Sequence, residues 1–217
     1  QWNIGLDFEI QQGKYSAAID VFNRENSLML RDIVLPVTSG YSVAKTNATG
    51  VRNAGVELTL TANPLPANGI IKWFSRLNIS YVKNRIMSLP NGGRDYVFVE
   101  GDRFDKSHIL SVGSPINAFY LYKTLGVYST DDDVPVNKYT GERFRSANGP
   151  YTAGAFHFAD LDGDYLIDIF NSGLNPDKMP IGDPNPKVTG GWTNNITWKN
   201  FTLGLFFNFT FGRDILN

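Results

Sequence analysis

Residues 192–211, WTNNITWKNFTLGLFFNFTF, carry the pattern on which the fold prediction rests. Apolar side chains recur at every second position in two runs, 192–198 and 201–211, with Asn194 as the one polar exception and mostly polar residues between them. A period of two is typical of β-strands, because successive side chains point to opposite faces. Lys199 and Asn200 separate the runs by the length of a two-residue hairpin turn. The stretch therefore predicts an antiparallel hairpin with one apolar face.

The same alternation occurs earlier in the chain. It predicts four more strands, at residues 2–10, 15–22, 51–62 and 71–81. Two architectures give strands one apolar face. A soluble β-sandwich turns that face toward a shared core, whereas a membrane barrel turns it toward lipid and its polar face toward the lumen.

Three features favour the membrane barrel. The strands run about ten residues, the length of a tilted membrane-spanning strand. Short connections (11–14, 63–69, 199–200) alternate with long ones (about 24–50 and 84–188), as in outer-membrane barrels. Aromatic residues of the apolar face lie near both ends of the strands, as in interfacial girdles. One end has Tyr15, Trp73, Trp198 and Phe201, and the other has Trp2, Tyr81, Trp192 and Phe211.

We therefore predict an all-β fold, an antiparallel transmembrane β-barrel segment with a long, locally folded extracellular loop. Residues 1–83 would form barrel strands with one extracellular loop at about 24–50. Residues 84–188 would form a large extracellular loop region, and residues 189–217 a barrel hairpin. Six strands are too few to close a membrane barrel, which begins at about eight. We therefore expect a piece of a longer protein.

The composition argues against several other classes. A formal net charge of −1 gives no basic surface for nucleic acid. No cysteine is present, so no disulfide framework stabilises the chain. The two histidines, His108 and His157, show neither zinc-site spacing nor a neighbouring nucleophile-elbow sequence. We expect no enzymatic activity and no organic cofactor.

The segment DLDGDYLID, residues 160–168, has the spacing of a calcium loop. Such a loop supplies oxygens from positions 1, 3, 5, 7, 9 and 12. Tyr165 stands at position six, where glycine is usual, and position twelve lacks the usual acid. The alternative is an acidic turn closed by backbone hydrogen bonds, and either role is structural. The predicted calcium ligands are Asp160, Asp162, Asp164, the Leu166 carbonyl, Asp168 and Asn171.

Over nearly all of its 217 residues the chain resembles the C-terminal part of the barrel of SusC/RagA-type TonB-dependent outer-membrane transporters from Bacteroidetes. Each matching segment is weak alone, but their joint order and spacing are specific. In order they include GLDFEI, LPVTSGY, TNATGVRNAGVELTL, WFSRLNISYVKNRIMSL, VGSPINAFYLYKTLGVY, DLDGDYLID, PIGDPNPKVTGG and WKNFTLGLFFNFTFGRDILN.

The resemblance implies a 22-stranded barrel in the bacterial outer membrane, with the long loops extracellular. The plug domain and the remaining strands are expected to be absent from this chain. The resemblance also implies TonB-dependent import of nutrients such as oligosaccharides or peptides, together with a SusD-type surface lipoprotein that acts as a lid.

Phe119, Tyr120 and Tyr122 are candidate substrate-binding residues, because aromatic faces pack on apolar sugar faces. The alternative is that they pack inside the folded loop. A second function hypothesis is a soluble secreted β-sandwich that binds carbohydrate and holds a structural calcium ion.

Overall fold

The structure is a computed structural model that divides into two compact units. The first comprises residues 1–94, 112–116 and 183–217, and the second comprises residues 95–111 and 117–182. Among the described residues no helix has the length and apolar character needed to cross a membrane. The residues that the structure describes are 1–34, 37–66, 68–90, 96–98, 107–169 and 174–216.

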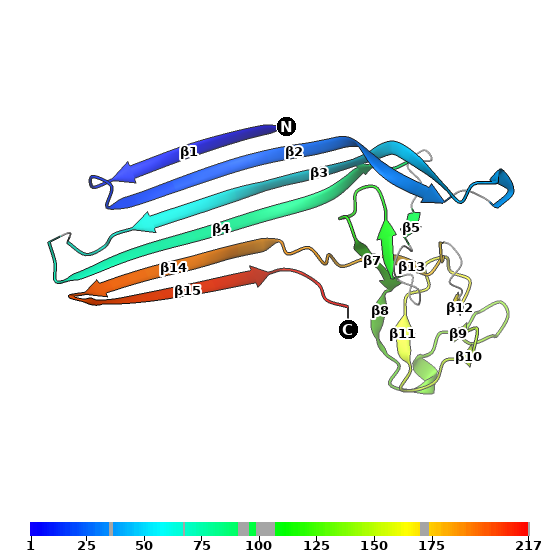
Figure 1. Ribbon diagram of the computed structural model, residues 1–217. Coiled ribbons are helices and arrows are strands. Elements are labelled where there is room, and N and C mark those ends of the chain that lie inside the picture. The colour runs from blue at the N-terminus through cyan, green and yellow to red at the C-terminus, as the bar shows by residue number, and fades with distance from the viewer. Residues whose placement is uncertain (35–36, 67, 91–95, 99–106, 170–173, 217) are drawn as a thin grey trace. The chain divides into compact units, whose positions relative to one another are not determined.

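The first unit is built on one six-stranded antiparallel sheet (Figure 1). All six predicted strands are present, and the all-β antiparallel prediction is confirmed. In sheet order the strands are β1 (Trp2–Ile10), β2 (Tyr15–Val34), β3 (Val43–Ala62), β4 (Ile71–Ser88), β14 (Val188–Trp198) and β15 (Phe201–Phe211).

Three of these strands extend well beyond their predicted ends. β2 and β3 continue their pairing through most of the segment predicted as the loop 24–50, and the 3₁₀ helix η1 (Val37–Ser39) lies between them. The pairing shifts register twice, between Asn26 and Met29 and between Met29 and Arg31. Because each bulge breaks the period of two, the sequence pattern hides this part of the strands. Much of the segment predicted as a loop is therefore strand, and its extracellular position stays a prediction.

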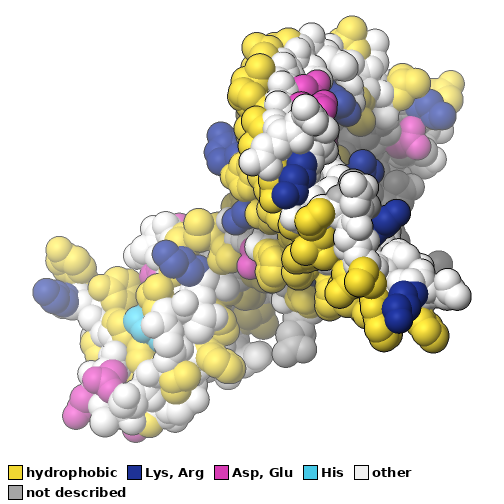
Figure 2. Space-filling view, turned by 90° about the vertical axis from the view of Figure 1, so that its left-hand side faces the viewer, with side chains coloured by type: hydrophobic (Ala, Val, Ile, Leu, Met, Phe, Trp, Pro, Cys, Tyr) yellow, Lys and Arg dark blue, Asp and Glu magenta, His cyan; other side chains and the backbone are white. Residues whose placement is uncertain are grey.

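Strand register places all the apolar runs on one face of the sheet. Directly paired residues share a face, and one row across the sheet joins Ile19, Leu58 and Ile79. We call this side the apolar face. Its large side chains are mostly exposed, and hydrophobic atoms line one side of the sheet in Figure 2. The face comprises even-numbered residues 2–10, 56–62 and 188–198, and odd-numbered residues 15–21, 71–81 and 201–211.

Two tryptophans cover polar side chains in the middle of the apolar face. Ser75 and Asn194 are direct partners across β4 and β14. Trp192 Nε1 donates to Ser75 Oγ at 2.9 Å, and Trp73 Nε1 donates to Asn194 Oδ1 at 3.0 Å. Because β14 begins at Val188, Trp192 lies in the strand interior rather than at its end as predicted. Gly190 and Gly191 had obscured the true start of the strand.

The second unit contains short strands in three small sheets. A four-stranded sheet has the order β13-β7-β6-β5, a ribbon pairs β11 with β8, and a third sheet has the order β10-β9-β12. The bounds are β5 (Tyr96–Phe98), β6 (His108–Leu110), β7 (Ala118–Tyr122), β8 (Thr124–Val127), η2 (Asp131–Asp133), β9 (Arg145–Ser146), β10 (Gly149–Pro150), β11 (Phe156–Phe158), β12 (Leu166–Ile167) and β13 (Lys178–Ile181).

This unit has its own hydrophobic core. Tyr128, Val134, Phe144 and Ile167 are each at most 3% exposed and form one cluster. Partly buried aromatic residues, among them Tyr151, pack around it. The long insertion between β4 and β14 is thus locally folded, as predicted.

Candidate functional site

Residues 160–168, which we call the aspartate loop, form a tight turn that follows β11 and includes β12. Ligand oxygens of Asp160, Asp162 and Asp164 lie within 4.8 Å of one another. Asp160 accepts hydrogen bonds from the backbone N–H groups of Gly163 at 2.7 Å and Tyr165 at 2.9 Å. Asp164 accepts one from Leu166 at 2.7 Å. These are the backbone hydrogen bonds expected of a closed acidic turn.

Tyr165 departs from the calcium-loop pattern in residue type but not in backbone shape. Its φ is 68°, the left-handed conformation that glycine usually supplies at this turn. A non-glycine residue accepts this conformation at a cost of roughly 1–2 kcal/mol. The loop therefore keeps the sharp turn that a cation-binding loop needs.

The structure brings together three of the six predicted calcium ligands. Their carboxylates are the hard oxygen donors that calcium prefers. Asp168 is not in this cluster, and its backbone carbonyl accepts a hydrogen bond from Asn175 Nδ2 at 2.7 Å. Leu166 begins strand β12, and Asn171 lies outside the described residues. Calcium binding by this loop stays a prediction.

Asp177 is a key residue that the sequence analysis missed. Its side chain is 0% exposed, and its carboxylate accepts hydrogen bonds from the N–H of Leu161 at 3.2 Å and of Asp168 at 2.8 Å. It thereby joins the two ends of the aspartate loop. Burial raises the pKa of the Asp177 carboxyl, the two N–H groups lower it, and the carboxylates of Asp160 and Asp164 raise it. The only sequence signal is the turn-forming triplet Asn-Pro-Asp at residues 175–177.

Asn175 connects the aspartate loop to two of the predicted substrate-binding residues. The Tyr120 hydroxyl donates to the Asn175 carbonyl at 2.7 Å and accepts from the Asn175 N–H at 2.7 Å. The Tyr122 hydroxyl donates to the Asp168 carbonyl and accepts from Asn175 Nδ2 at 3.3 Å. Both tyrosine hydroxyls therefore serve internal structure.

The rings of the three candidate aromatic residues are largely covered. Phe119 is 7% exposed and Tyr120 is 3% exposed. The ring of Tyr122 is half-buried, with Lys178 Nζ 5.0 Å from its centroid. This arrangement matches the alternative in which these rings pack inside the loop. Substrate binding by Phe119, Tyr120 and Tyr122 stays a prediction.

Both histidines make aromatic contacts within the second unit. The His157 ring stacks on Tyr128 with centroids 4.6 Å apart, and His108 lies 5.2 Å from Phe119. Each contact is an ordinary packing arrangement for an imidazole.

Side-chain hydrogen bonds attach residues 112–116 to the rest of the first unit. Asn84 of β4 accepts from the Ile116 N–H at 2.8 Å and donates to Asn53 Oδ1 at 2.7 Å. Asn185 Nδ2 donates to the Ile116 carbonyl at 2.9 Å. Two segments distant in sequence, 112–116 and 183–187, are thereby fixed within the first unit.

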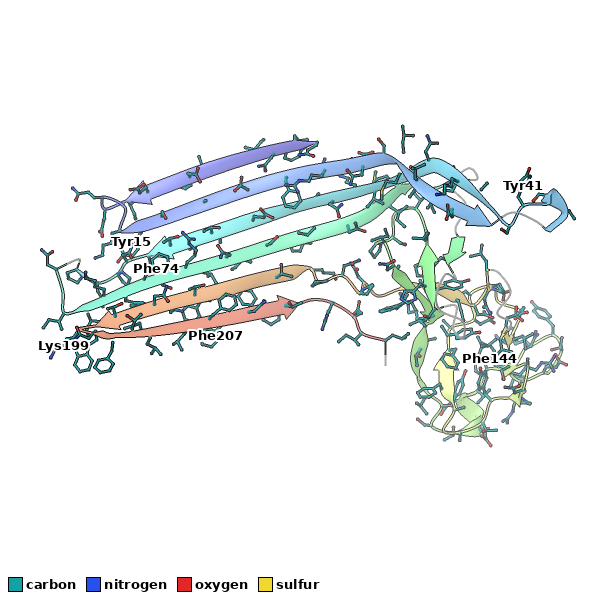
Figure 3. All side chains as sticks on the ribbon, viewed as in Figure 1. Tyr15, Tyr41, Phe74, Phe144, Lys199 and Phe207 are labelled. Carbon is teal, nitrogen blue, oxygen red and sulfur yellow. The ribbon has the colours of Figure 1, made fainter. Side chains whose placement is uncertain are left out.

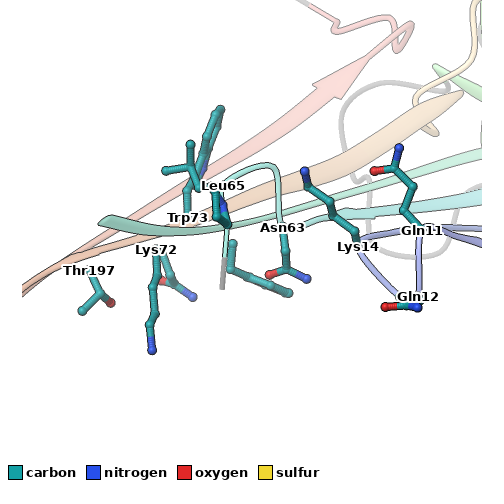
Figure 4. A pocket seen from close by; sticks show the side chains of 12 residues that line it. Gln11, Gln12, Lys14, Asn63, Leu65, Lys72, Trp73 and Thr197 are labelled. Carbon is teal, nitrogen blue, oxygen red and sulfur yellow. The ribbon is translucent and has the colours of Figure 1, made fainter. Parts of the chain in front are cut away.

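A pocket of ≈ 640 Å³ lies at the short-turn end of the first unit (Figure 4). Its lining includes the turn residues 11–14 together with Lys72 and Trp73. The side chains of Lys14 and Lys72 point in different directions in Figure 4, and Lys14 Nζ lies 5.5 Å from the Tyr15 ring. The two ammonium groups therefore do not converge on one ligand position.

Comparison with known proteins gives relatives along the whole chain, although no family model matches. The chain is 30% identical over 219 residues to TonB-dependent receptor P3 of Formosa agariphila, covering 100% of the chain and 20% of that protein. It is 27% identical to TonB-dependent receptor SusC of Bacteroides thetaiotaomicron, covering 92% of the chain and 18% of that protein. The chain thus spans about a fifth of the length of these relatives.

The fold is also like that of a solved structure, described as the structure of the RagAB peptide transporter. The TM-score is 0.67 at 21% identity, covering 97% of this chain and 20% of that chain. At this identity the likeness concerns the fold. Sequence and fold together identify the chain as a segment of the SusC/RagA type of TonB-dependent receptor.

Proposed function

We propose that this chain is part of a TonB-dependent importer in the bacterial outer membrane. The observation that carries the proposal is the register of the first unit, which gathers the apolar side chains of six strands on one exposed face. A contiguous apolar surface of this size is unusual on a soluble protein and marks a contact with another apolar phase. The names of its relatives support the same reading.

The dimensions of the apolar face support a membrane-spanning role. On β4 the face runs from Ile71 to Tyr81. Ten residue steps at about 3.3 Å give about 33 Å along the strand. A strand tilted by roughly 45° would then cover about 23 Å of membrane height, close to the apolar band of about 25 Å on such barrels.

The opposite face of the sheet would line the lumen. It carries polar and charged side chains of both signs, so it does not select for one charge of substrate. Asp20 and Glu57 are direct partners on this face, and Lys72 and Arg76 lie on the neighbouring strand β4. The polar face also includes Asn3, Asp7, Glu9, Ser16, Thr59, Asn78, Thr193, Asn195, Thr197, Thr202 and Asn208.

The imported substrates would be nutrients such as oligosaccharides or peptides, taken up with a SusD-type surface lipoprotein as the lid. A relative carries the name SusC, and a solved structure of similar fold is described as a peptide transporter. The second unit, with its own core, would be the extracellular part that contacts the lid or the substrate. The chain itself would contribute barrel wall and this unit, without a catalytic step.

The competing hypothesis is a soluble secreted β-sandwich that binds carbohydrate. A sandwich requires a second sheet over the apolar face. In the described residues, side chains such as Leu6 (56% exposed) and Phe207 (51% exposed) have no such cover. This observation favours the barrel segment.

The test is to find the native protein that contains this segment. Peptides of this sequence would be traced by mass spectrometry in outer-membrane and soluble fractions. We expect a band several times larger than 24.2 kDa that needs detergent and co-purifies with a lipoprotein. A detergent-independent band of that smaller mass in the soluble fraction would contradict the proposal. Deleting the gene should also abolish growth on the imported nutrient.

A further inference from the structure

We propose that a basic patch on the first unit binds the phosphate of an anionic membrane lipid. The patch consists of Arg52 on β3 and Lys83 and Arg85 on β4. The proposal rests on the proposed function, because it takes the apolar face to be in contact with lipid.

The patch lies on the same side of the sheet as the apolar face. Val56 pairs with Tyr81 in the last apolar row of these two strands. The next row pairs Ala54 with Lys83, and the row after it pairs Arg52 with Arg85. The pairing is regular through these rows, with the first register shift only at Gly50. The three basic side chains therefore follow the apolar face directly.

This position corresponds to the headgroup layer of a membrane. At about 3.3 Å per residue, Lys83 lies about 7 Å and Arg85 about 13 Å along the strand beyond Tyr81. For a strand tilted by roughly 45°, these distances become about 5 Å and 9 Å of height. The headgroup layer extends roughly 5–8 Å beyond the hydrocarbon on each side. Lipid phosphates are therefore within reach of all three flexible side chains.

The charges of the patch lack a matching set of acids. Lys83 and Arg85 are exposed, and no ion pair joins either of them to a carboxylate among the residues that the structure describes. Glu25, the direct partner of Arg52, is the single acidic residue in these rows of β2, β3 and β4. Three cations and one anion leave an excess positive charge.

The arrangement of the two arginines calls for an anion between them. Arg52 and Arg85 are direct partners across the strands. Like charges in this position are destabilising, unless a shared counter-ion lies between them. Arg52 Nε donates to Asn23 Oδ1 at 2.7 Å, which orients the guanidinium group on this face. Guanidinium groups match the geometry of phosphate oxygens, so a phosphate group is the natural counter-ion.

The experiment uses the full-length protein that carries this segment, purified in detergent micelles. Native mass spectrometry would measure binding of phosphatidylglycerol, with phosphatidylcholine as the zwitterionic comparison. The test variant is Lys83→Gln/Arg85→Gln. The matched control is Lys72→Gln/Arg76→Gln, which removes one lysine and one arginine from the same strand β4 but on the opposite face.

We expect the test variant to bind phosphatidylglycerol about 25-fold more weakly, since each of its two lost basic residues contributes about fivefold near an anionic membrane surface. The control variant should bind it as the unchanged protein does, and phosphatidylcholine binding should not change in either. Equal losses in both variants, or no loss in the test variant, would overturn the proposal. Displacement of the lipid by millimolar inorganic phosphate would also overturn it, in favour of a free-phosphate site.

The same preparation separates this proposal from the proposed function. A protein that stays detergent-dependent but shows no loss in the test variant contradicts only the lipid site. A protein that is soluble without detergent contradicts the membrane assignment itself, and the lipid site with it.

Discussion

The two units of this chain place the same kinds of side chain in opposite environments. In the sheet, Phe201 is 72% exposed and Phe207 is 51% exposed, whereas Tyr128 and Phe144 of the second unit are 3% exposed. Figure 3 shows the side chains of the sheet standing singly from the strands, while those around Phe144 crowd together. An aromatic-rich composition therefore does not reveal which solvent a segment faces.

The difference follows from what each unit can bury. The irregular second unit folds its chain around a cluster of rings and removes them from water, as the hydrophobic effect requires. A single sheet has no interior of its own. Its apolar face must therefore be covered from outside, and under the proposed function lipid covers it.

The largest expected effect comes from placing a charge on the apolar face. Leu205→Arg puts a cation near the middle of that face, opposite Asn194. We expect a loss of about 2–4 kcal/mol in the free energy of unfolding, the cost of arginine at the bilayer midplane. Denaturant unfolding of the full-length protein in lipid vesicles would measure it.

The matched control is Asn208→Arg on the polar face of the same strand, opposite Gly191. We expect a change of less than about 1 kcal/mol, because an arginine on the lumen side stays hydrated. Similar losses for both variants would break the comparison between the two faces.

The next largest effect is expected inside the second unit. Asp177→Leu leaves the N–H groups of Leu161 and Asp168 without their acceptor. Each lost hydrogen bond to the charged carboxylate costs about 1.5–3 kcal/mol, so the aspartate loop should open far more often. Hydrogen exchange at these two amides would measure the change.

Asp132→Leu serves as the control, since Asp132 is an exposed residue of η2 in the same unit. Exchange at the Leu161 and Asp168 amides should not change in this variant. Equal acceleration in both variants would mean that Asp177 does not hold the loop.

If the aspartate loop binds calcium, adding calcium should make the loop open less often. At a calcium concentration ten times the dissociation constant, binding adds about 1.4 kcal/mol to the free energy of opening the loop. Asp162→Asn should weaken binding, measured by titration calorimetry and by hydrogen exchange with and without a chelator. Asp132→Asn is the control. If the chelator has no effect on the unchanged protein, the loop is an acidic turn held by hydrogen bonds alone.

The smallest expected effect concerns Tyr128 in the core of the second unit. Its hydroxyl is buried and has no hydrogen-bond partner among the described residues. Tyr128→Phe should therefore leave the free energy of unfolding unchanged or raise it by up to about 1 kcal/mol. Thermal unfolding of the two proteins at neutral pH would measure the difference.

Tyr128 should also make the free energy of unfolding depend on pH in the alkaline range. Burial raises the pKa of Tyr128 from its ordinary value of 10.0 to about 12. Between these values the unfolded chain loses the proton while the folded chain keeps it. The free energy of unfolding should therefore fall as the pH rises from about 10 to about 12. Tyr128→Phe should remove this part of the fall, and identical pH profiles would contradict the assignment.

Much of the sheet could be predicted because its signals are local. Alternation identified every strand and both faces, and the register confirms that the predicted apolar runs share one side. The prediction failed where the alternation is interrupted. Bulges near Asn26 and Met29 hid the extension of β2, and Gly190 and Gly191 hid the start of β14.

The candidate site was less predictable because its important contacts join distant residues. The spacing of Asp160, Asp162 and Asp164 found the acidic turn. Nothing in the sequence showed that Asp177 is buried behind it, or that Asn175 bonds to Tyr120 across 55 positions. Burial of the Phe119 and Tyr120 rings likewise depends on neighbours that the sequence does not identify.

The sequence by itself determined that the six strands of the large sheet form, which face of each is apolar and where the chain makes its short turns. These properties depend on the pleat of the backbone and on residues close in sequence. The tertiary structure alone decided that β4 pairs with β14 across the long insertion, and that Trp73 and Trp192 then cover Asn194 and Ser75. Pairing of distant strands depends on the folded chain bringing their edges together, and no local pattern records that.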